Sequence, residues 1–244
     1  MRNVFTRTAS MKDTTTHYCP GCGHGVVHRL VAEAVDELGL AERTIGIAPV
    51  GCAVLAYNYM DLDMVEVAHG RAPAVATGMK RFRPDAIVFS YQGDGDLASI
   101  GAGEILHAAH RGEHITVIFV NNAIYGMTTG QMAPTTLLGQ VTTTSQNGRN
   151  AETEGYPMCV AEVLAVLPGT IYVERCSLHD AAHTRKTKQA ITHAFELQRD
   201  NAPGLALVEV LSPCPTQWRL KPKQAMQWVR DEMVKTFPLG KIKG

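Results

Sequence analysis

Short apolar runs alternate with amphipathic segments along most of the chain. An apolar run of about four to eight residues, bounded by turn residues, is typical of a buried strand. The predicted strands are Thr44–Ala48, Met64–Ala68, Ala86–Tyr91, Ile115–Val120, Thr170–Cys176 and Leu205–Val210.

Segments with apolar residues at helical spacing lie between these strands. Gly39 ends the first of them, since glycine readily takes the left-handed conformation found at helix ends. The predicted helices are Val27–Leu38, Ala72–Phe82, Ile100–Ala109, Met158–Leu167 and Asp180–Asp200. This alternation predicts an α/β fold, in which helices cover both faces of a mostly parallel sheet.

Three segments lack these patterns. Ala123–Glu154 is rich in Thr, Gly, Gln and Asn, and a loop of this length in a compact domain is usually functional or disordered. We expect it to cover a cofactor or meet a partner. The polar arm 1–16 either extends over a partner or is frayed, and the tail 217–244 contains the basic, partly helical Lys221–Lys235. We expect residues 1–244 to form one domain.

Composition excludes several classes of protein. The formal net charge is zero and 45% of the residues are hydrophobic, which fits a globular enzyme and gives no sign of nucleic acid or an anionic membrane as partner. No apolar run approaches the length of a membrane span, and the N-terminus lacks the apolar region of a secretory signal. We therefore expect a cytoplasmic protein, whose six cysteines are metal-binding or catalytic rather than disulfide-bonded.

An acidic turn and an asparagine pair follow two neighbouring predicted strands. Gly93-Asp94-Gly95-Asp96 comes after the third strand, and Asn121-Asn122 follows the fourth. Because a right-handed crossover brings both strand ends to one edge of the sheet, Asp94 and Asn122 are expected to lie close together. Carboxylate and amide oxygens suit Mg²⁺ when phosphate oxygens complete its shell. The alternative is an ordinary strand–helix–strand unit with common turn residues.

Four cysteines stand in loops where they can converge. Cys19 and Cys22 form a CxxC pair, Cys52 ends a predicted strand, and Cys214 follows the last one. Four thiolates hold zinc or an iron–sulfur cluster, and a CxxC before a helix is also the arrangement of a redox dithiol. The other two cysteines, Cys159 and Cys176, are expected to be buried thiols.

The chain resembles the thiamine-diphosphate-binding β subunit of the 2-oxoacid:ferredoxin oxidoreductases, over roughly residues 17–216. The order and spacing of the shared segments carry this resemblance, and the segments are YCPGCGHG (Tyr18–Gly25), PVGCA (Pro49–Ala53), HGRAPAVATGMK (His69–Lys80), QGDGD (Gln92–Asp96), NNAIYGMTTGQMAPTT (Asn121–Thr136) and SPCPT (Ser212–Thr216).

The resemblance implies three cofactors and the residues that hold them. Asp94, the Asn122 side chain and the Ile124 carbonyl would hold Mg²⁺, while Cys19, Cys22, Cys52 and Cys214 would ligate one [4Fe–4S] cluster. The residues expected to contact thiamine diphosphate are Gly51, Cys52, His69, Gly70, Gly93, Asp94, Gly95, Asp96, Asn122, Ile124, Gly126, Met127 and Thr128.

The resemblance also implies an activity. It is the coenzyme A-dependent oxidative decarboxylation of a 2-oxoacid to an acyl-CoA and CO₂, with electrons passed through the cluster to ferredoxin. His24 is expected either to bond the cofactor or substrate or to cap its helix, and His69 to contact the cofactor. The chain departs from the family at Ala53-Val54-Leu55, where serine-like residues are expected. These apolar residues and Met127 favour a branched-chain acid such as 2-oxoisovalerate over 2-oxoglutarate.

The glutamate that activates thiamine normally lies in a second, pyrimidine-binding domain, for which the chain has no room. We therefore expect a larger partner subunit that carries this domain, and further small and ferredoxin-like subunits. Two rival functions remain. One is a subunit of a non-oxidative thiamine-dependent decarboxylase, and the other is a non-enzymatic Rossmann-like domain with a structural zinc.

Overall fold

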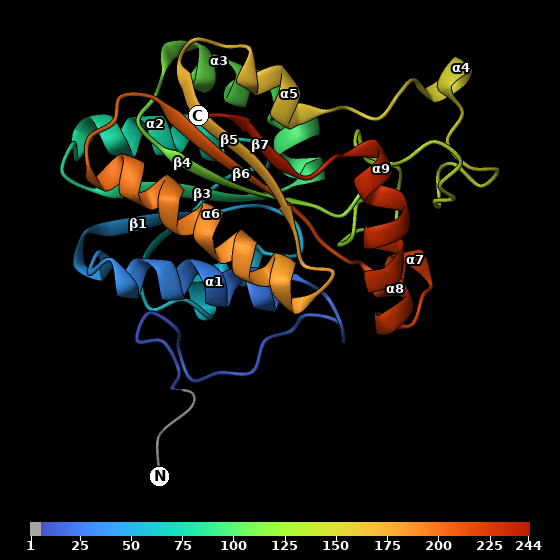
Figure 1. The fold of residues 1–244 in the computed structure, drawn as a ribbon, viewed down its shortest axis with the longest axis horizontal. Helices are drawn as coiled ribbons and strands as arrows, with labels where there is room; N and C mark the ends of the chain where they lie inside the picture. The colour runs from blue at the N-terminus through green and yellow to red at the C-terminus, as the bar shows by residue number, and fades with distance from the viewer. Residues whose placement is uncertain (1–5) are drawn as a thin grey trace.

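A seven-stranded sheet forms the centre of the computed structural model, which describes residues 6–244 (Figure 1). The strand order is β2-β1-β3-β4-β6-β5-β7, and every neighbouring pair is parallel except β5 with β7. The strands are β1 Thr44–Ala48, β2 Asp63–Glu66, β3 Ile87–Gly93, β4 Thr116–Asn121, β5 Thr170–Ser177, β6 Leu205–Leu211 and β7 Gly240–Lys243.

Helices cover both faces of this sheet, as Figure 1 shows. On one face α1 (His24–Glu37) and α6 (Ala181–Arg199) lie side by side, and their apolar residues join those of the central strands in one core cluster. A second cluster lies on the other face, beneath α2 (Ala72–Phe82), α3 (Ala102–Arg111) and α5 (Val160–Ala165). The central strands are buried on both faces, which explains why they read as continuous apolar runs.

The predicted α/β fold is confirmed, and the six predicted strands are present within a few residues of their expected ends. The helix Ala72–Phe82 has its predicted bounds, and Gly39 follows α1 with a left-handed φ of 65°. The predicted Asp180–Asp200 is α6, with Asp180 as its N-cap. Sequence patterns missed β7, a short antiparallel edge strand whose residues Gly-Lys-Ile-Lys have little β character.

Of the two alternatives for the arm, fraying is wrong at Ser10 and Met11, while its extension over a partner stays a prediction. Ser10 is buried, and its N–H and Oγ donate to the Asp36 carboxylate of α1 at 3.2 and 2.5 Å. Met11 forms a β-bridge with Met60. The arm from residue 6 onward therefore packs on its own chain, while residues 1–5 lie outside the described residues.

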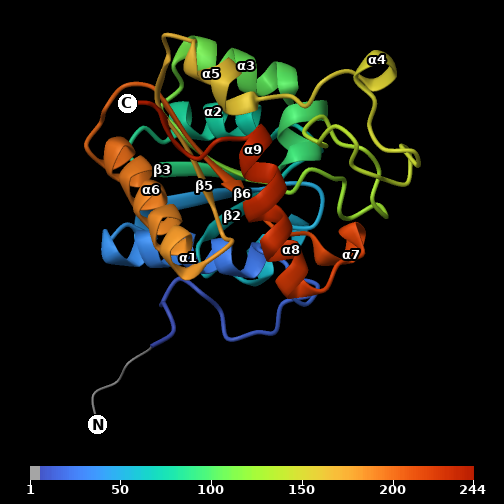
Figure 2. The same ribbon diagram turned by 45° about the vertical axis from the view of Figure 1, so that its right-hand side comes forward.

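The long loop runs from the end of β4 to α5 and contains one short helix, α4 (Ala151–Glu154). The tail is helical as expected, and Figure 2 shows it standing beside the carboxyl ends of the strands. Its elements are α7 Pro215–Trp218, α8 Pro222–Trp228, the π-helical turn η4 Val229–Met233 and α9 Val234–Thr236. A third apolar cluster joins this tail to Ala123 and Leu137 of the loop. None of the helices among residues 6–244 has the length and apolarity needed to span a membrane.

Candidate active site

The acidic turn after β3 buries a carboxylate among neutral donors. Asp94 is 3% exposed. Its Oδ1 accepts the N–H of Gly95 at 2.8 Å, and its Oδ2 accepts the N–H of Ile124 and the Thr135 hydroxyl at 3.2 and 2.7 Å. The chain then enters a π-helical turn, η3 (Gly95–Ile100), a rare conformation that is frequent at functional sites. Gly95 is required here because a Cβ would overlap the ring of Tyr125.

Burial raises the pKa of Asp94 to about 6, and the hydrogen bonds from Thr135, Gly95, Ile124 and Ala123 only partly oppose this shift. All of these donors are neutral, so the ionised carboxylate lacks a cationic partner among them. A divalent cation beside Asp94 would favour the ionised form.

The two asparagines after β4 have different surroundings: Asn121 is bonded inside the protein, and Asn122 faces a cavity. Asn121 is fully buried; its Nδ2 donates to Glu209 at 2.7 Å, and Glu209 is paired with the buried Arg175 at 2.7 Å. The Oδ1 of Asn121 accepts the N–H of Ala123, and Ala123 takes a left-handed φ of 55°. Asn122, by contrast, lines the cavity beside Asp94, and its Oδ1 accepts the Ile124 N–H at 3.3 Å. Asn121 thus anchors the turn that presents Asn122.

Asp96 links the segment after β2 to the end of β3. Its Oδ1 accepts the N–H of Gly70 at 2.9 Å and lies 2.6 Å from Nδ1 of His69, and its Oδ2 accepts Nε2 of Gln92 at 2.5 Å. Gly70, with φ of 76°, packs so closely on Gly101 that a Cβ would lie 2.6 Å from the Gly101 nitrogen. The structure therefore places Gly70 beneath the site and not in the cavity.

One cavity gathers the other predicted cofactor residues at the carboxyl edge of β1, β3 and β4. The residues that line it are His24, Pro49, Val50, Gly51, Cys52, Ala53, His69, Gly93, Asp94, Gly95, Asp96, Asn122, Ile124, Tyr125, Gly126, Met127 and Thr128. The sequence did not assign Pro49, Val50 and Tyr125 to this cavity, although all three lie inside the segments that carry the resemblance. Val54 and Leu55 lie in the 3₁₀ turn η2 (Val54–Asn58) and do not line the cavity.

His24 is the first residue of α1, and the hydroxyl of Tyr91 orients it. The Tyr91 oxygen lies 2.9 Å from Nδ1 of His24, and this is the only hydrogen bond that the described structure gives this hydroxyl. Burial raises the pKa of Tyr91 and lowers that of His24 to about 4. Because Nδ1 is the one acceptor that the described structure gives this hydroxyl, we infer that the phenol donates to Nδ1 and that Nε2 carries the imidazole proton. Gly23, not His24, is the N-cap of α1, and no side chain among the described residues caps this helix, so the His24 ring lines the cavity with its Nδ1 bonded to Tyr91.

Further histidines and tyrosines surround this pair. His28 stacks on Tyr91 with ring centroids 4.6 Å apart, and its Nε2 lies 2.7 Å from the Tyr18 hydroxyl. Burial lowers the pKa of His28 to about 3. The two uncharged pairs, His24–Tyr91 and His28–Tyr18, thus form one packed aromatic cluster. Nothing in the sequence pattern marked Tyr91, since it reads only as an apolar strand residue.

The four candidate cysteines line a second cavity, of about 190 Å³, next to the first. Cys19 and Cys22 lie in a turn closed by a hydrogen bond from the Cys22 N–H to the Cys19 carbonyl. Cys52 and Cys214 come together at Gly126, where a Cβ would lie 3.0 and 3.6 Å from their sulfurs. One water occupies about 30 Å³ of liquid, so this cavity has room for a group of several atoms.

The thiols raise each other's pKa. Burial is the largest cause, and the neighbouring thiols add to it for Cys52 and Cys214, whose pKa values rise to about 12. Burial also raises the pKa of Cys22, and Cys19 raises it further. Four thiolates at this place therefore need a cationic group, which a zinc ion or an iron–sulfur cluster supplies.

Cys159, Cys176 and Arg71 line neither of these cavities, whereas Thr128 lines the first. Cys176 is buried in β5 as expected, while Cys159 precedes α5 and is only half-buried. Arg71 pairs with Glu104 of its own chain. The hydroxyl of Thr128 donates to Gln131 at 2.6 Å, which is a bond within the loop.

Comparison with known proteins places this site in a family. Residues 49–210 match the model of the thiamine pyrophosphate enzyme C-terminal TPP binding domain. The ketoisovalerate oxidoreductase subunit VorA of Methanothermobacter thermautotrophicus is 53% identical over 239 residues, which are 98% of this chain and 50% of that protein. The 2-oxoglutarate synthase subunit KorB of Archaeoglobus fulgidus is 36% identical over 88% of this chain and 76% of that protein.

A solved structure agrees with these matches. The 2-oxoglutarate:ferredoxin oxidoreductase from Magnetococcus marinus, with 2-oxoglutarate, coenzyme A and succinyl-CoA bound, superimposes with a TM-score of 0.78 at 29% identity. The match covers 93% of this chain and 73% of that chain. Fold and site thus define a thiamine-diphosphate-binding domain. The chain belongs to the thiamine pyrophosphate enzymes and, among them, to the subunits of the 2-oxoacid:ferredoxin oxidoreductases. It spans about half the length of the ketoisovalerate oxidoreductase subunits that it matches.

Proposed function

We propose that this chain is the β subunit of a heteromeric 2-oxoacid:ferredoxin oxidoreductase, which converts a 2-oxoacid, coenzyme A and oxidised ferredoxin to an acyl-CoA, CO₂ and reduced ferredoxin. The observation that carries this proposal is the contact between the two cavities. Cys52, Asn122, Gly126 and Met127 line both of them. Because electron transfer weakens steeply with distance, a redox group among the cysteines suits an electron donor held beside Asp94.

The donor sets fit the proposed groups. Asp94, Asn122 and the Ile124 carbonyl offer hard oxygens, which suit Mg²⁺ bound to a diphosphate. The cysteines offer four soft thiolates in a space larger than one ion, which suits a [4Fe–4S] cluster. When bound, thiamine diphosphate supplies the electron sink for decarboxylation, and the cluster accepts electrons singly.

The chain's own residues bind and orient a ligand in the cavity. The Nε2–H of His24 is the donor that this chain offers to a ligand carboxylate or carbonyl. Burial lowers the pKa of His24 to about 4, so the ring is uncharged at neutral pH. It therefore orients a ligand by a hydrogen bond and brings no positive charge to the cavity. Asp96 holds His69 and the strand-end loops in place.

The cavity beside Asp94 at the carboxyl ends of β1, β3 and β4, here called the strand-end cavity, is too small to enclose a whole cofactor. Its volume is about 120 Å³, whereas pockets that bury a drug-sized ligand have about 300–1,000 Å³. The loop beside it exposes large apolar side chains, among them Met127, Val141 and Tyr156, the last 75% exposed. We infer that a larger subunit with the pyrimidine-binding domain covers this face. Further small and ferredoxin-like subunits complete the proposed complex.

The favoured substrate is a branched-chain 2-oxoacid such as 2-oxoisovalerate. Val50, Ala53 and Met127 give the cavity apolar walls, and among the described residues that line it there is no lysine or arginine. A second carboxylate, as in 2-oxoglutarate, would need such a cation. The ketoisovalerate oxidoreductase subunits are also more similar to the chain than the 2-oxoglutarate synthase subunits that it matches. We further propose that residues 1–244 act as one domain and that the complex works in the reducing cytoplasm, where free thiols persist.

Co-purification followed by kinetics tests this function. The chain should be isolated anaerobically, alone and with the proteins that co-purify with it, and kcat/KM measured for 2-oxoisovalerate and 2-oxoglutarate with ferredoxin as acceptor. We expect no turnover by the chain alone and at least a tenfold preference of the complex for the branched-chain acid, equal to about 1.4 kcal/mol. Turnover by the reconstituted chain alone would refute the need for a partner. A preference for 2-oxoglutarate would refute the substrate.

A further inference from the structure

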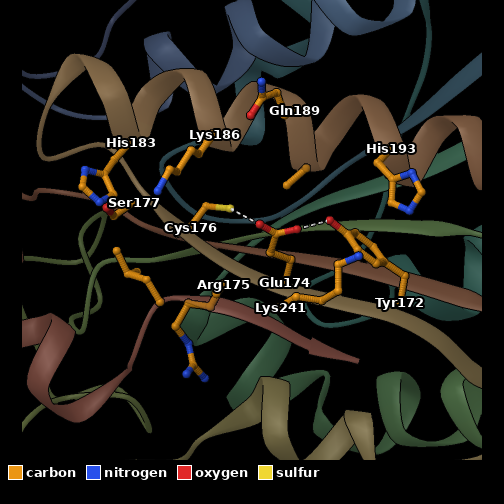
Figure 3. Close-up of a pocket in the computed structure, with 13 residues that line it drawn as sticks. Tyr172, Glu174, Arg175, Cys176, Ser177, His183, Lys186, Gln189, His193 and Lys241 are labelled. Atoms are coloured by element: carbon orange, nitrogen blue, oxygen red, sulfur yellow. Dashed lines mark hydrogen bonds between the residues drawn. The ribbon is translucent and has the colours of Figure 1, made fainter. Parts of the chain in front are cut away.

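A cavity of about 540 Å³ lies away from the strand-end site, between α6 and the strands β5 and β7 (Figure 3). Figure 3 shows Cys176 and Tyr172 bonded to Glu174, with His183 and Ser177 at one end of the cavity. The proposed function uses none of these residues.

Two histidines and an aspartate converge at that end, where β5 turns into α6. Nε2 of His179 lies 3.3 Å from Oδ2 of Asp180, and Nδ1 of His183 lies 2.9 Å from Oδ1 of the same carboxylate. The centroids of the two imidazole rings are 4.0 Å apart. Each residue offers one ligand atom, and these three atoms lie within 4.8 Å of one another.

These separations match those around a small metal ion. Bonds of about 2.0–2.1 Å to nitrogen and oxygen place neighbouring ligand atoms about 3.3 Å apart in a tetrahedron and about 3.0 Å apart in an octahedron. The distances of 3.3 Å from His179 to Oδ2 and 2.9 Å from His183 to Oδ1 of Asp180 are of this size, and the three ligand atoms already lie within 4.8 Å of one another. A metal ion at Oδ2 could therefore bind both imidazoles once the Nδ1 of His183 turns from Oδ1 towards Oδ2.

The surrounding bonds prepare His179 as a ligand. Its side chain is only 6% exposed, and its Nδ1 lies 2.7 Å from the hydroxyl of Ser177, a fully buried residue. A bond from Nδ1–H to this hydroxyl leaves the Nε2 lone pair facing Asp180. Histidine ligands of metals almost always donate their other ring nitrogen in this way. Oδ1 of Asp180 caps α6 by accepting the His183 N–H at 2.8 Å, so Oδ2 is the oxygen left for a metal.

We propose that His179, Asp180 and His183 form a binding site for a transition-metal ion, with Zn²⁺ as the ion that this donor set favours. Two imidazoles and one carboxylate suit Zn²⁺ or Co²⁺ better than Mg²⁺ or Ca²⁺, which prefer oxygen alone. Three protein ligands leave at least one coordination position open. Because His183 also lines the cavity, an ion held there borders it, and the open position can take a water or an anionic ligand.

Titration with Co²⁺ as a probe for Zn²⁺ distinguishes this site from the cysteines. Thiolate ligands give intense near-ultraviolet charge-transfer bands with Co²⁺, whereas nitrogen and oxygen ligands give only visible bands. We expect the full chain to bind one Co²⁺ that gives only visible bands, separate from any Co²⁺ that the cysteines bind with a thiolate band. His179→Ala and His183→Ala should each weaken this binding at least about tenfold.

Two further variants serve as controls. Asp180→Ser removes the ligand but keeps a good helix cap, so it should weaken Co²⁺ binding as strongly while leaving the metal-free melting temperature nearly unchanged. His193→Ala removes another histidine of α6 that lines the same cavity and should bind Co²⁺ as the natural chain does. The proposal is overturned if the natural chain shows no such binding, if Asp180→Ser and His183→Ala retain it, or if His193→Ala loses it equally.

Discussion

The strand-end cavity and the cysteine cavity share one wall but are held together differently. In the first, the polar groups are already satisfied, since Asp94 and Asp96 each accept several hydrogen bonds from their own chain. In the second, burial raises the pKa of Cys22, Cys52 and Cys214 and neighbouring thiols raise it further, while Cys19 is exposed. The oxygen site is therefore preorganised for the proposed Mg²⁺, whereas the four thiolates would depend on the proposed metal centre for their stability.

Their positions in the chain explain this difference. The oxygen ligands follow β3 and β4, two paired parallel strands, so the sheet itself sets their separation. The cysteines come from the N-terminal turn, the loop after β1 and the segment after β6, and a metal centre is the natural way to bind these segments to one another. The two sites should consequently respond independently to substitution.

The largest expected effect is the loss of the redox group from a single cysteine substitution. Cys214→Ala removes the most buried of the four thiols, and we expect the iron content of anaerobically prepared protein to fall from about four per chain to near zero. Activity of the complex with ferredoxin should disappear with the iron, while thiamine diphosphate binding, measured by calorimetry, persists.

Cys176→Ala is the matched control, because Cys176 is an equally buried thiol outside both cavities. It should retain iron and activity. Absence of iron from the natural protein would favour the non-oxidative decarboxylase, and one zinc with no thiamine binding would favour the non-enzymatic alternative.

The reciprocal substitution should affect the other site alone. Asp94→Asn keeps the shape of the side chain but removes the charge that a divalent cation needs, so we expect the affinity for thiamine diphosphate with Mg²⁺ to fall at least about 100-fold. Iron content should stay unchanged, because Asp94 does not line the cysteine cavity. Asp85→Asn, at an exposed aspartate two residues before β3, should change neither quantity. Loss of iron in Asp94→Asn would show that the two sites form one cooperative unit.

The sequence predicted those parts of the molecule that depend on local pattern. Apolar runs identified the six parallel strands, and parallel topology then required that Asp94 and Asn122 meet at one edge. The predicted convergence of Cys19, Cys22, Cys52 and Cys214 also followed from the positions of strand ends, and the structure brings all four to one cavity.

What the sequence did not predict depends on contacts between distant residues. Tyr91 has the pattern of a core strand residue, and only the packing of α1 against β3 shows that it bonds His24. Thr135 lies 41 positions from Asp94 in a loop without periodicity, so no spacing rule connects the two. Gly70, for which the resemblance implies a cofactor contact, has its N–H bonded to Asp96 and its Cα packed against Gly101, and no local pattern indicates these two contacts.

The smallest expected effect tests the orientation of His24. Tyr91→Phe removes the hydroxyl that fixes the Nε2–H tautomer and leaves the ring stack with His28 in place. A neutral hydrogen bond has a net value of about 1 kcal/mol, so we expect kcat of the complex to fall about five- to tenfold, with KM and iron content nearly unchanged. Tyr172→Phe is the control, since it also deletes a hydroxyl that donates to a neighbour, here Glu174, but lies outside both cavities. Equal losses of activity in both variants would mean that Tyr91 contributes only to stability, whereas a loss confined to Tyr91→Phe would show that the strand-end cavity depends on His24 donating from Nε2.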